Sequence, residues 1–288
     1  MPIDPNKLYN WQFPEIEQNY TVRDSIIYAV GLGFGADPLD EGQLPFVFEE
    51  RPFQVVPTMA AVLCTPGFWL RAPETGVDWE KVLHGEMNIE IHNSLRPEAT
   101  VVATNKVVNI VDKGRGKGAL LFQKRVVTDK VTGTRLATLS STTFARGDGG
   151  CGGDRYPAPK PHSLPDREPD KVCNLPTLRQ AALIYRLSGD PNPLHADPKV
   201  AALAGFNRPI LHGLCTLGVA GHAILRTYCS YDAMRLRSLK LRFSAPVYPG
   251  ENILTEMWRD GKNVSFRARV VERDVVVLNN GLAEVADG

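Results

Sequence analysis

Hydrophobic and polar residues alternate in several stretches of the second half of the chain. Leu239, Leu241 and Phe243 occupy every second position, and the same spacing recurs in residues 264–270. Alternation of this kind predicts strands of an antiparallel sheet with one buried face. The segment 259–263 contains Asp-Gly and precedes one of these stretches, which predicts a hairpin turn.

One long segment is apolar on nearly every helical face. Residues 213–228 therefore predict a helix that is surrounded by other structure, and the strands that follow should wrap around it. In the first half the matching helix is expected to begin near Thr58, and Pro66 and Gly67 should end it after about two turns. We expect the shorter helix to leave a tunnel for an apolar substrate.

The two halves of the chain look like copies of one unit. Residues 20–28 and 176–185 each place a threonine before a helical apolar pattern, so Thr21 and Thr177 are predicted N-caps. Residues 89–98 and 241–250 each run from an alternating strand into a proline-bearing turn. Two matches in the same order argue for duplication of a unit of about 120 to 150 residues. The predicted fold class is α+β, with two antiparallel sheets, each wrapped around a central helix.

A stretch rich in glycine and proline divides the copies. We predict an N-terminal unit at 1–146, a linker at 147–170 and a C-terminal unit at 171–288. The alternative, a phosphate-binding glycine loop, is disfavoured because such loops follow a strand, open a helix and usually carry Lys-Ser or Lys-Thr.

Composition excludes several classes of protein. The 288 residues hold 33 Lys and Arg against 32 Asp and Glu, so no global field attracts nucleic acid. Five cysteines without C-x-x-C spacing favour reduced thiols and disfavour a zinc site. No signal peptide, apolar membrane span or C-terminal Ser-Lys-Leu is evident, so we expect a cytoplasmic protein, or a peroxisomal one whose address is absent from this chain.

The densest group of chemical residues lies at 185–198, Tyr-Arg-Leu-Ser-Gly-Asp-Pro-Asn-Pro-Leu-His-Ala-Asp-Pro. Two prolines stiffen this loop and hold Asp190, Asn192 and His195 together. A carboxylate and an imidazole that reach one water can carry out paired proton transfers. In the alternative, the polar residues cap the following helix and His195 packs in the core. The loop alone leaves both open.

The segment Pro-Ile-Leu-His-Gly at 209–213 leads into the predicted buried helix. Free N–H groups at a helix N-terminus can stabilise an oxyanion, and Gly213 lets a ligand approach the backbone closely. The alternative for Gly213 is close packing against a strand, and both can hold together.

A local basic cluster lies in a glycine-rich turn. Lys113, Arg115 and Lys117 offer charge for the phosphates of a coenzyme. Solvated hairpin cations are the commoner meaning of such a cluster.

The motif Ser-Gly-Asp-x-Asn-Pro-Leu-His, followed by Pro-Ile-Leu-His-Gly-Leu-Cys-Thr-Leu-Gly, resembles the signature of type 2 enoyl-CoA hydratases in the MaoC-like superfamily. The likeness extends to 83–86, 112–114 and 242–250, and is similar to the hydratase part of peroxisomal multifunctional enzymes. The resemblance implies a double hot dog fold and reversible hydration of trans-2-enoyl-CoA to (3R)-3-hydroxyacyl-CoA. It also implies an acyl-CoA substrate, no metal or cofactor, and a homodimer.

The resemblance also implies roles for individual residues. Asp190 and His195 would be the catalytic pair, Asn192 would order water and substrate, and the Gly213 N–H would bind the thioester oxygen. The remaining substrate-site residues would be Pro191, Pro193, Leu194, His84, Gly85, Lys113 and Phe243. We expect His195 to activate water and Asp190 to serve C2 of the substrate, with the reverse assignment left open.

Two alternatives remain at the level of sequence. Hot dog folds also host thioesterases, because a fold does not fix its chemistry. A non-catalytic acyl-CoA-binding protein fits the first unit, which lacks the Asp-x-Asn-Pro-x-His motif, better than the second.

Overall fold

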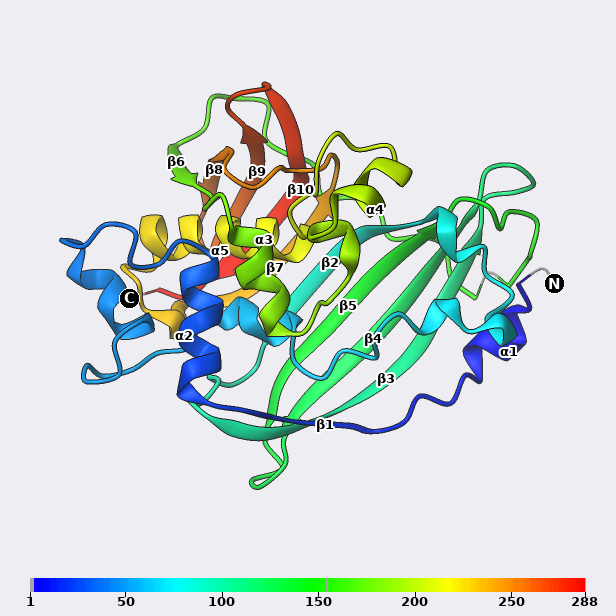
Figure 1. Cartoon of the computed structure of the whole chain (residues 1–288), viewed down its shortest axis with the longest axis horizontal. Helices are drawn as coiled ribbons and strands as arrows, with labels where there is room; N and C mark the ends of the chain where they lie inside the picture. Colours follow the sequence, from blue (N-terminus) through cyan, green and yellow to red (C-terminus); the bar gives the residue numbers. More distant parts are fainter. Residues whose placement is uncertain (1–2, 154, 288) are drawn as a thin grey trace.

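The computed structural model describes residues 3–153 and 155–287. The strands are β1 Ile16–Tyr20, β2 Val82–Ile91, β3 Ala99–Asp112, β4 Ala119–Asp129, β5 Arg135–Ala145, β6 Lys171–Pro176, β7 Leu236–Phe243, β8 Asn252–Asp260, β9 Asn263–Val270 and β10 Val275–Val285. The α-helices are α1 Pro5–Tyr9, α2 Val22–Gly31, α3 Ala181–Tyr185, α4 Pro198–Leu203 and α5 Gly213–Tyr228. Figure 1 shows α2, α3 and α5 close together at the left, with α1 apart from them near the N-terminus.

All these strands join in one antiparallel sheet with the order β1-β3-β4-β5-β2-β7-β10-β9-β8-β6. Its two five-stranded halves meet edge to edge where β2 pairs with β7, from Glu86 opposite Arg242 to Glu90 opposite Ser238. The two sheets expected from the sequence are therefore continuous. The two strands that pair at this seam are those that hold the matching segments of the repeat.

The long buried helix forms where the sequence predicts it. Helix α5 contacts β6, β7, β8 and β10, and its side chains Val219, Ala220, Ile224 and Leu225 are buried. Its apolar surface on all sides follows from this placement, because strands cover one face and segments of the first half cover the other. The hairpin predicted at 259–263 connects β8 to β9.

The corresponding helix of the first half is shorter than predicted. It is a 3₁₀ helix, η2 (Pro57–Ala61), and it ends five residues before Pro66. The Nη2 of Arg125 donates to the Ala61 carbonyl oxygen at 2.6 Å and so takes an acceptor that the next helical N–H would use. Cys64 then has a left-handed backbone, with φ of 50°. Proline is thus not what ends this helix.

The two threonines predicted to cap helices behave differently. Thr21 caps α2, and its side chain and that of Asp24 form a capping box. The prediction for Thr177 is wrong, because α3 begins only at Ala181. The Thr177 hydroxyl instead donates to the Glu251 carbonyl oxygen at 2.8 Å and accepts from the Gly250 N–H.

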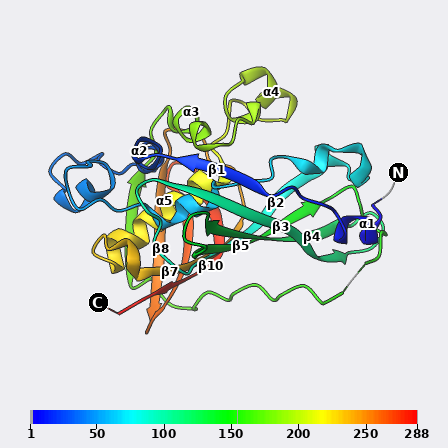
Figure 2. The same cartoon turned by 90° about the horizontal axis from the view of Figure 1, so that it is seen from below.

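The Gly- and Pro-rich segment contains no helix or strand within 147–153 and 155–170. Figure 2 shows it running along the side of the sheet away from α2, α3 and α4. His162 fixes it there through contacts with Ser265 and Asn280. The unit boundaries themselves stay an interpretation of the sequence. None of the helices in the described residues has the length and apolar character needed to cross a membrane.

Candidate active site

The loop after α3 is held by its own polar side chains. The 3₁₀ helix η6 (Arg186–Ser188) ends at Gly189, whose φ of 114° favours glycine. The Asp190 Oδ1 then accepts from the Asn192 N–H at 3.2 Å, and the Asn192 Oδ1 accepts from the Leu194 N–H at 3.1 Å. The second of these bonds caps the 3₁₀ helix η7 (Pro193–His195). Asp190 and Asn192 thus cap local backbone, as one of the two interpretations of the sequence predicted. The Asp190 Oδ2 and the Asn192 amide nitrogen take no part in these two bonds.

His195 is buried and held as a neutral base. Its Nδ1–H donates to the Ile210 carbonyl oxygen at 2.8 Å, which leaves Nε2 with a free lone pair. Burial is the largest influence on the imidazole and lowers its pKa below the usual value of 6.5, against the opposing effects of the Ile210 bond and the Asp190 charge. His195 is therefore unprotonated at neutral pH, as a general base must be.

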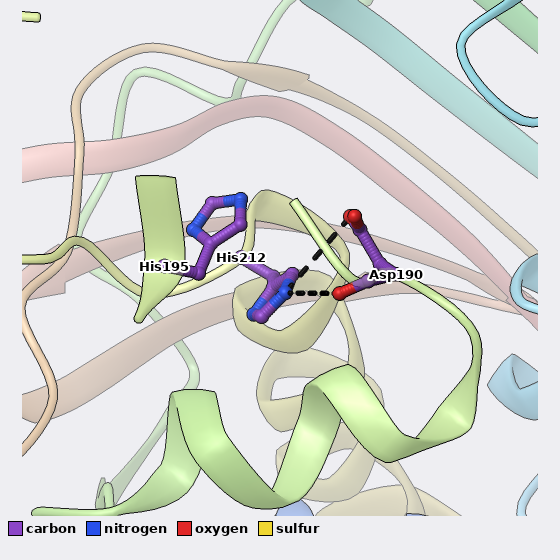
Figure 3. A group of neighbouring side chains, drawn as sticks. All are labelled: Asp190, His195 and His212. Atoms are coloured by element: carbon purple, nitrogen blue, oxygen red, sulfur yellow. Dashed lines mark hydrogen bonds and ion pairs between the residues drawn. The ribbon is translucent and has the colours of Figure 1, made fainter. Parts of the chain in front are cut away.

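His212 packs against His195 on the other side of the site. The two rings stack with centroids 3.7 Å apart and planes 27° apart. The His212 Nε2–H donates to the backbone oxygen of Asp190 at 3.2 Å, and the same nitrogen lies 4.0 Å from the Asp190 Oδ2 (Figure 3). Burial, and then the neighbouring His195, lower the pKa of His212 to about 4. Its neutral ring thus positions both members of the predicted pair.

Asp190, His195 and His212 converge on one point. One ligand atom from each, a carboxylate oxygen and two ring nitrogens, lies within 4.8 Å of the others. The Asp190 side chain remains 42% exposed, whereas His195 is 8% exposed. The group therefore opens to solvent on the carboxylate side.

The same three residues form a possible set of metal ligands. A metal ion is chelated when the lone pairs of its ligands point at the ion. The rings of His195 and His212 are stacked, so their nitrogen lone pairs run nearly parallel and do not point at one ion. The Nδ1 of His195 is also already engaged with Ile210. The arrangement does not require a metal, and the absence of a metal cofactor stays a prediction.

Gly213 lies beside this group, at the first position of α5. The N-cap residue, His212, makes no side-chain capping bond, and its backbone oxygen accepts from the N–H groups of Cys215 and Thr216. Within the described chain, no acceptor is recorded for the Gly213 N–H. A Cβ at 213 would lie 3.2 Å from a ring carbon of Phe243. Both interpretations of Gly213 therefore hold: among the described residues its N–H is a free donor, and its α-carbon packs closely against the Phe243 ring.

Phe243 connects the two halves of the sheet at the site. Its ring lies 4.7 Å from that of His84, centroid to centroid, so these predicted residues and Gly213 gather together. His84 is exposed to solvent but crowded by protein, and desolvation is the largest influence that lowers its pKa to about 4. A Cβ on Gly85 would lie 3.2 Å from the Thr142 backbone oxygen, so strand packing accounts for this glycine.

Lys113 lies on the turn between β3 and β4 and is exposed. Its Nζ lies 5.7 Å above the Phe144 ring, and Phe144 pairs with Leu83, next to His84. The ammonium group is thus at the same end of the sheet as His84, outside the group formed by Asp190 and His195.

A cleft of about 660 Å³ reaches His195 from another direction. Arg179 and Arg208 line it and are exposed, whereas Asp190 and Gly213 do not line it. Sequence reasoning gave neither arginine a role, because neither belongs to a cluster of cations in the sequence. It also gave His212 no role, although this residue lies inside the quoted Pro-Ile-Leu-His-Gly motif.

Two family descriptions match the chain. Residues 18–147 match the MFE-2 hydratase 2 N-terminal domain, and residues 161–281 match the MaoC like domain. A probable enoyl-CoA hydratase 2 from Dictyostelium discoideum is 38% identical over 98% of this chain and 97% of its own length.

Solved structures give the same result. A MaoC-like dehydratase from Phytophthora capsici superposes with a TM-score of 0.89, at 34% identity over 99% of this chain and 100% of that one. A Mycobacterium tuberculosis protein described as having a double hotdog fold superposes with a TM-score of 0.58. It is 14% identical, covers 99% of this chain and 98% of its own, and so bears on the fold alone. The predicted α+β double hot dog fold is confirmed.

Proposed function

The chain belongs to the type 2 enoyl-CoA hydratase family of MaoC-like proteins, and we propose that it adds water reversibly to trans-2-enoyl-CoA to give (3R)-3-hydroxyacyl-CoA. The activity is that of a hydro-lyase in fatty-acid or related acyl-CoA metabolism. The observation that carries this proposal is the convergence of the Asp190 carboxylate and the neutral His195 beside the free Gly213 N–H.

The spacing of the pair supports binding of one water. Two groups that each bond one water at about 2.8 Å, with a near-tetrahedral angle between the bonds, lie about 4.6 Å apart. One oxygen of Asp190 and one ring nitrogen of His195 lie within 4.8 Å of each other, which is close to this spacing. A single water between the carboxylate and the imidazole would therefore contact both groups.

The reaction follows from these positions. The water oxygen bonds to C3 while His195 takes one water proton on Nε2, and the electrons of the C2–C3 double bond move onto the thioester oxygen. The Gly213 N–H donates to that oxygen where negative charge develops. The proton then passes from His195 to the Asp190 carboxylate, which delivers it to C2, so that both groups return to their starting forms. One water has been added, and the charges balance.

The neighbouring residues support binding of the rest of the substrate. Phe243 and His84 flank the approach to Gly213, and exposed Lys113 offers charge to the coenzyme A phosphates. The Asn192 amide nitrogen and the rigid Pro191, Pro193 and Leu194 segment would orient water and substrate. These roles rest on position and on the resemblance to the family.

Three further parts of the proposal concern the protein as a whole. We infer that it uses no metal or redox cofactor, because the steps above need only proton transfers and one oxyanion donor. We place it in the cytoplasm, or in peroxisomes in a eukaryotic cell, where relatives are named as peroxisomal enzymes. We expect a homodimer, which light scattering of the purified protein tests.

The experiment separates hydration from thioester hydrolysis. Crotonyl-CoA and longer enoyl-CoA thioesters are incubated with the protein, and loss of the enoyl absorbance is measured together with release of free thiol. We expect absorbance loss without thiol and a (3R) product by chiral analysis. Thiol release would favour a thioesterase, and neither signal would favour a binding protein.

A further inference from the structure

The apolar core of the first half is divided by polar residues on the inner face of the sheet. One apolar cluster contains Ala103, Val127 and Leu139, and the other contains Val107 and Leu121. Between them lies a diagonal row, which we call the polar strip. It consists of Asn105 on β3, Arg125 and Gln123 on β4, Ser141 and Thr143 on β5, and His84 on β2.

Strand register makes the polar strip continuous. Asn105 is opposite Arg125, Gln123 is opposite Ser141, and His84 is opposite Thr143. These strands lie side by side in Figure 1. The strip therefore runs from His84, at the candidate active site, to Arg125. On β5, His84 is opposite Thr143 and Arg125 is opposite Leu139. These two β5 residues are four positions apart, so the strip is about 14 Å long.

Arg125 ends the strip as a buried cation. It is 8% exposed, and within the described residues no carboxylate lies within ion-pair distance of it. Its Nη2 donates to the Ala61 carbonyl oxygen, but its Nε is buried without an acceptor. Burial lowers the pKa of its guanidinium to about 10, so the charge persists at neutral pH.

The neighbours of Arg125 also present donors. The Asn105 Nδ2 is buried without a partner. The Gln123 Oε1 accepts from the Trp69 Nε1 at 3.1 Å, which leaves the Gln123 amide nitrogen to donate. A buried cation with adjacent unpaired donors is unfavourable unless an acceptor joins it.

We infer that the polar strip binds an acyl chain that ends in a carboxylate, so that the substrate is an ω-carboxy enoyl-CoA with its carboxylate on Arg125 and Asn105. This inference rests on the proposed function. The thioester would lie at Gly213 and the terminal carboxylate would meet the fork of the guanidinium, which suits a carboxylate in two-point contact. The inner face of β3, β4 and β5, where the sequence predicts an apolar tunnel, is thus polar along its middle.

The experiment compares matched substrates on the wild-type enzyme. Hydration is measured for enoyl-CoA thioesters that end in a methyl group, a carboxylate or the methyl ester of that carboxylate, across a series of chain lengths. We expect kcat/KM for the carboxylate to exceed that for its ester by at least about tenfold at one length, and to fall at shorter and longer ones. Equal values at every length would overturn the inference.

Two variants complete the test. Arg125→Met should lower kcat/KM for the carboxylate at least about tenfold and leave the methyl-ended substrate unchanged. Lys124→Met, on the opposite face of β4, should change neither. Parallel loss on both substrates in Arg125→Met would show that Arg125 only supports η2 and would overturn the inference. If that variant does not fold, the acid and ester comparison decides. Failure of the wild type to hydrate any substrate would instead overturn the proposed function.

Discussion

Substitution of Gly213 by alanine separates catalysis from stability at the start of α5. The new Cβ would lie 3.2, 3.3 and 3.7 Å from three ring carbons of Phe243. The two shorter contacts are closer than ordinary van der Waals distance, so the ring or the helix terminus must move by a few tenths of an ångström. The N–H is retained but displaced from the position that the thioester oxygen occupies.

The size of the effect follows from what an oxyanion donor contributes. Removal of such a donor costs about 2.7 to 4 kcal/mol in the transition state. A displaced donor loses part of this, so we expect kcat to fall by about ten- to a hundredfold, or about 1.4 to 2.8 kcal/mol. Stability should change little, because a movement of a few tenths of an ångström at the exposed first residue of α5 relieves the contact with Phe243.

The assay is hydration kinetics together with thermal unfolding. Phe243→Leu in the Gly213→Ala background removes the ring that the methyl group contacts, so the double variant should recover part of the lost kcat. A Gly213→Ala enzyme with wild-type kcat would refute the oxyanion role. If kcat falls only in proportion to the fraction of folded protein, the claim that the substitution affects catalysis and not stability is refuted.

Three further predictions concern charge and pH. Lys113→Ala should raise KM for enoyl-CoA several-fold and leave kcat unchanged, because the lysine is proposed to bind the coenzyme A phosphates. Lys106→Ala, on the outer face of the sheet, is the control. If KM rises in Arg208→Ala instead, the phosphate role of Lys113 is contradicted. His222 is buried, and burial lowers its pKa from the ordinary value of 6.5 to about 4. The neutral ring is therefore favoured in the folded state, and its contribution to the free energy of unfolding should be constant above pH 6.5. As pH falls from 6.5 to 4, that contribution should be lost, by up to about 3 kcal/mol. His222→Gln should remove that part of the slope in denaturant unfolding, and an unchanged slope would contradict it. Because burial lowers the pKa of His195, kcat/KM should fall only below pH 6.5 on the acid side, and a fall that begins above pH 7 would contradict a neutral histidine base.

Local pattern was sufficient for the elements whose own side chains determine them. The apolar surface of residues 213–228 predicts α5 with its observed bounds, and Thr21 caps α2 as expected. The prediction for Thr177 failed because a distant turn at 249–251 takes its hydroxyl group. The end of η2 depends on Arg125, which is 64 residues away from Ala61 along the chain. Long-range hydrogen bonds of this kind leave no local signal.

The candidate site divides in the same way. The motif at 185–198 already places Asp190, Asn192 and His195 in one short loop. The meeting of Gly213 with Phe243 and His84 depends on the pairing of β2 with β7, which joins segments about 150 residues apart. The stacking of His212 on His195 depends on how α5 docks beside this loop. The roles of these residues remain predictions.

The most direct test of the central proposal is kcat for hydration of crotonyl-CoA by Asp190→Asn, His195→Gln and the double variant, with circular dichroism as the check of folding. We expect each single variant to lose at least about a hundredfold and the double variant to lose little more, because the pair acts on one water as a unit. Near-normal kcat in either folded single variant would contradict the account.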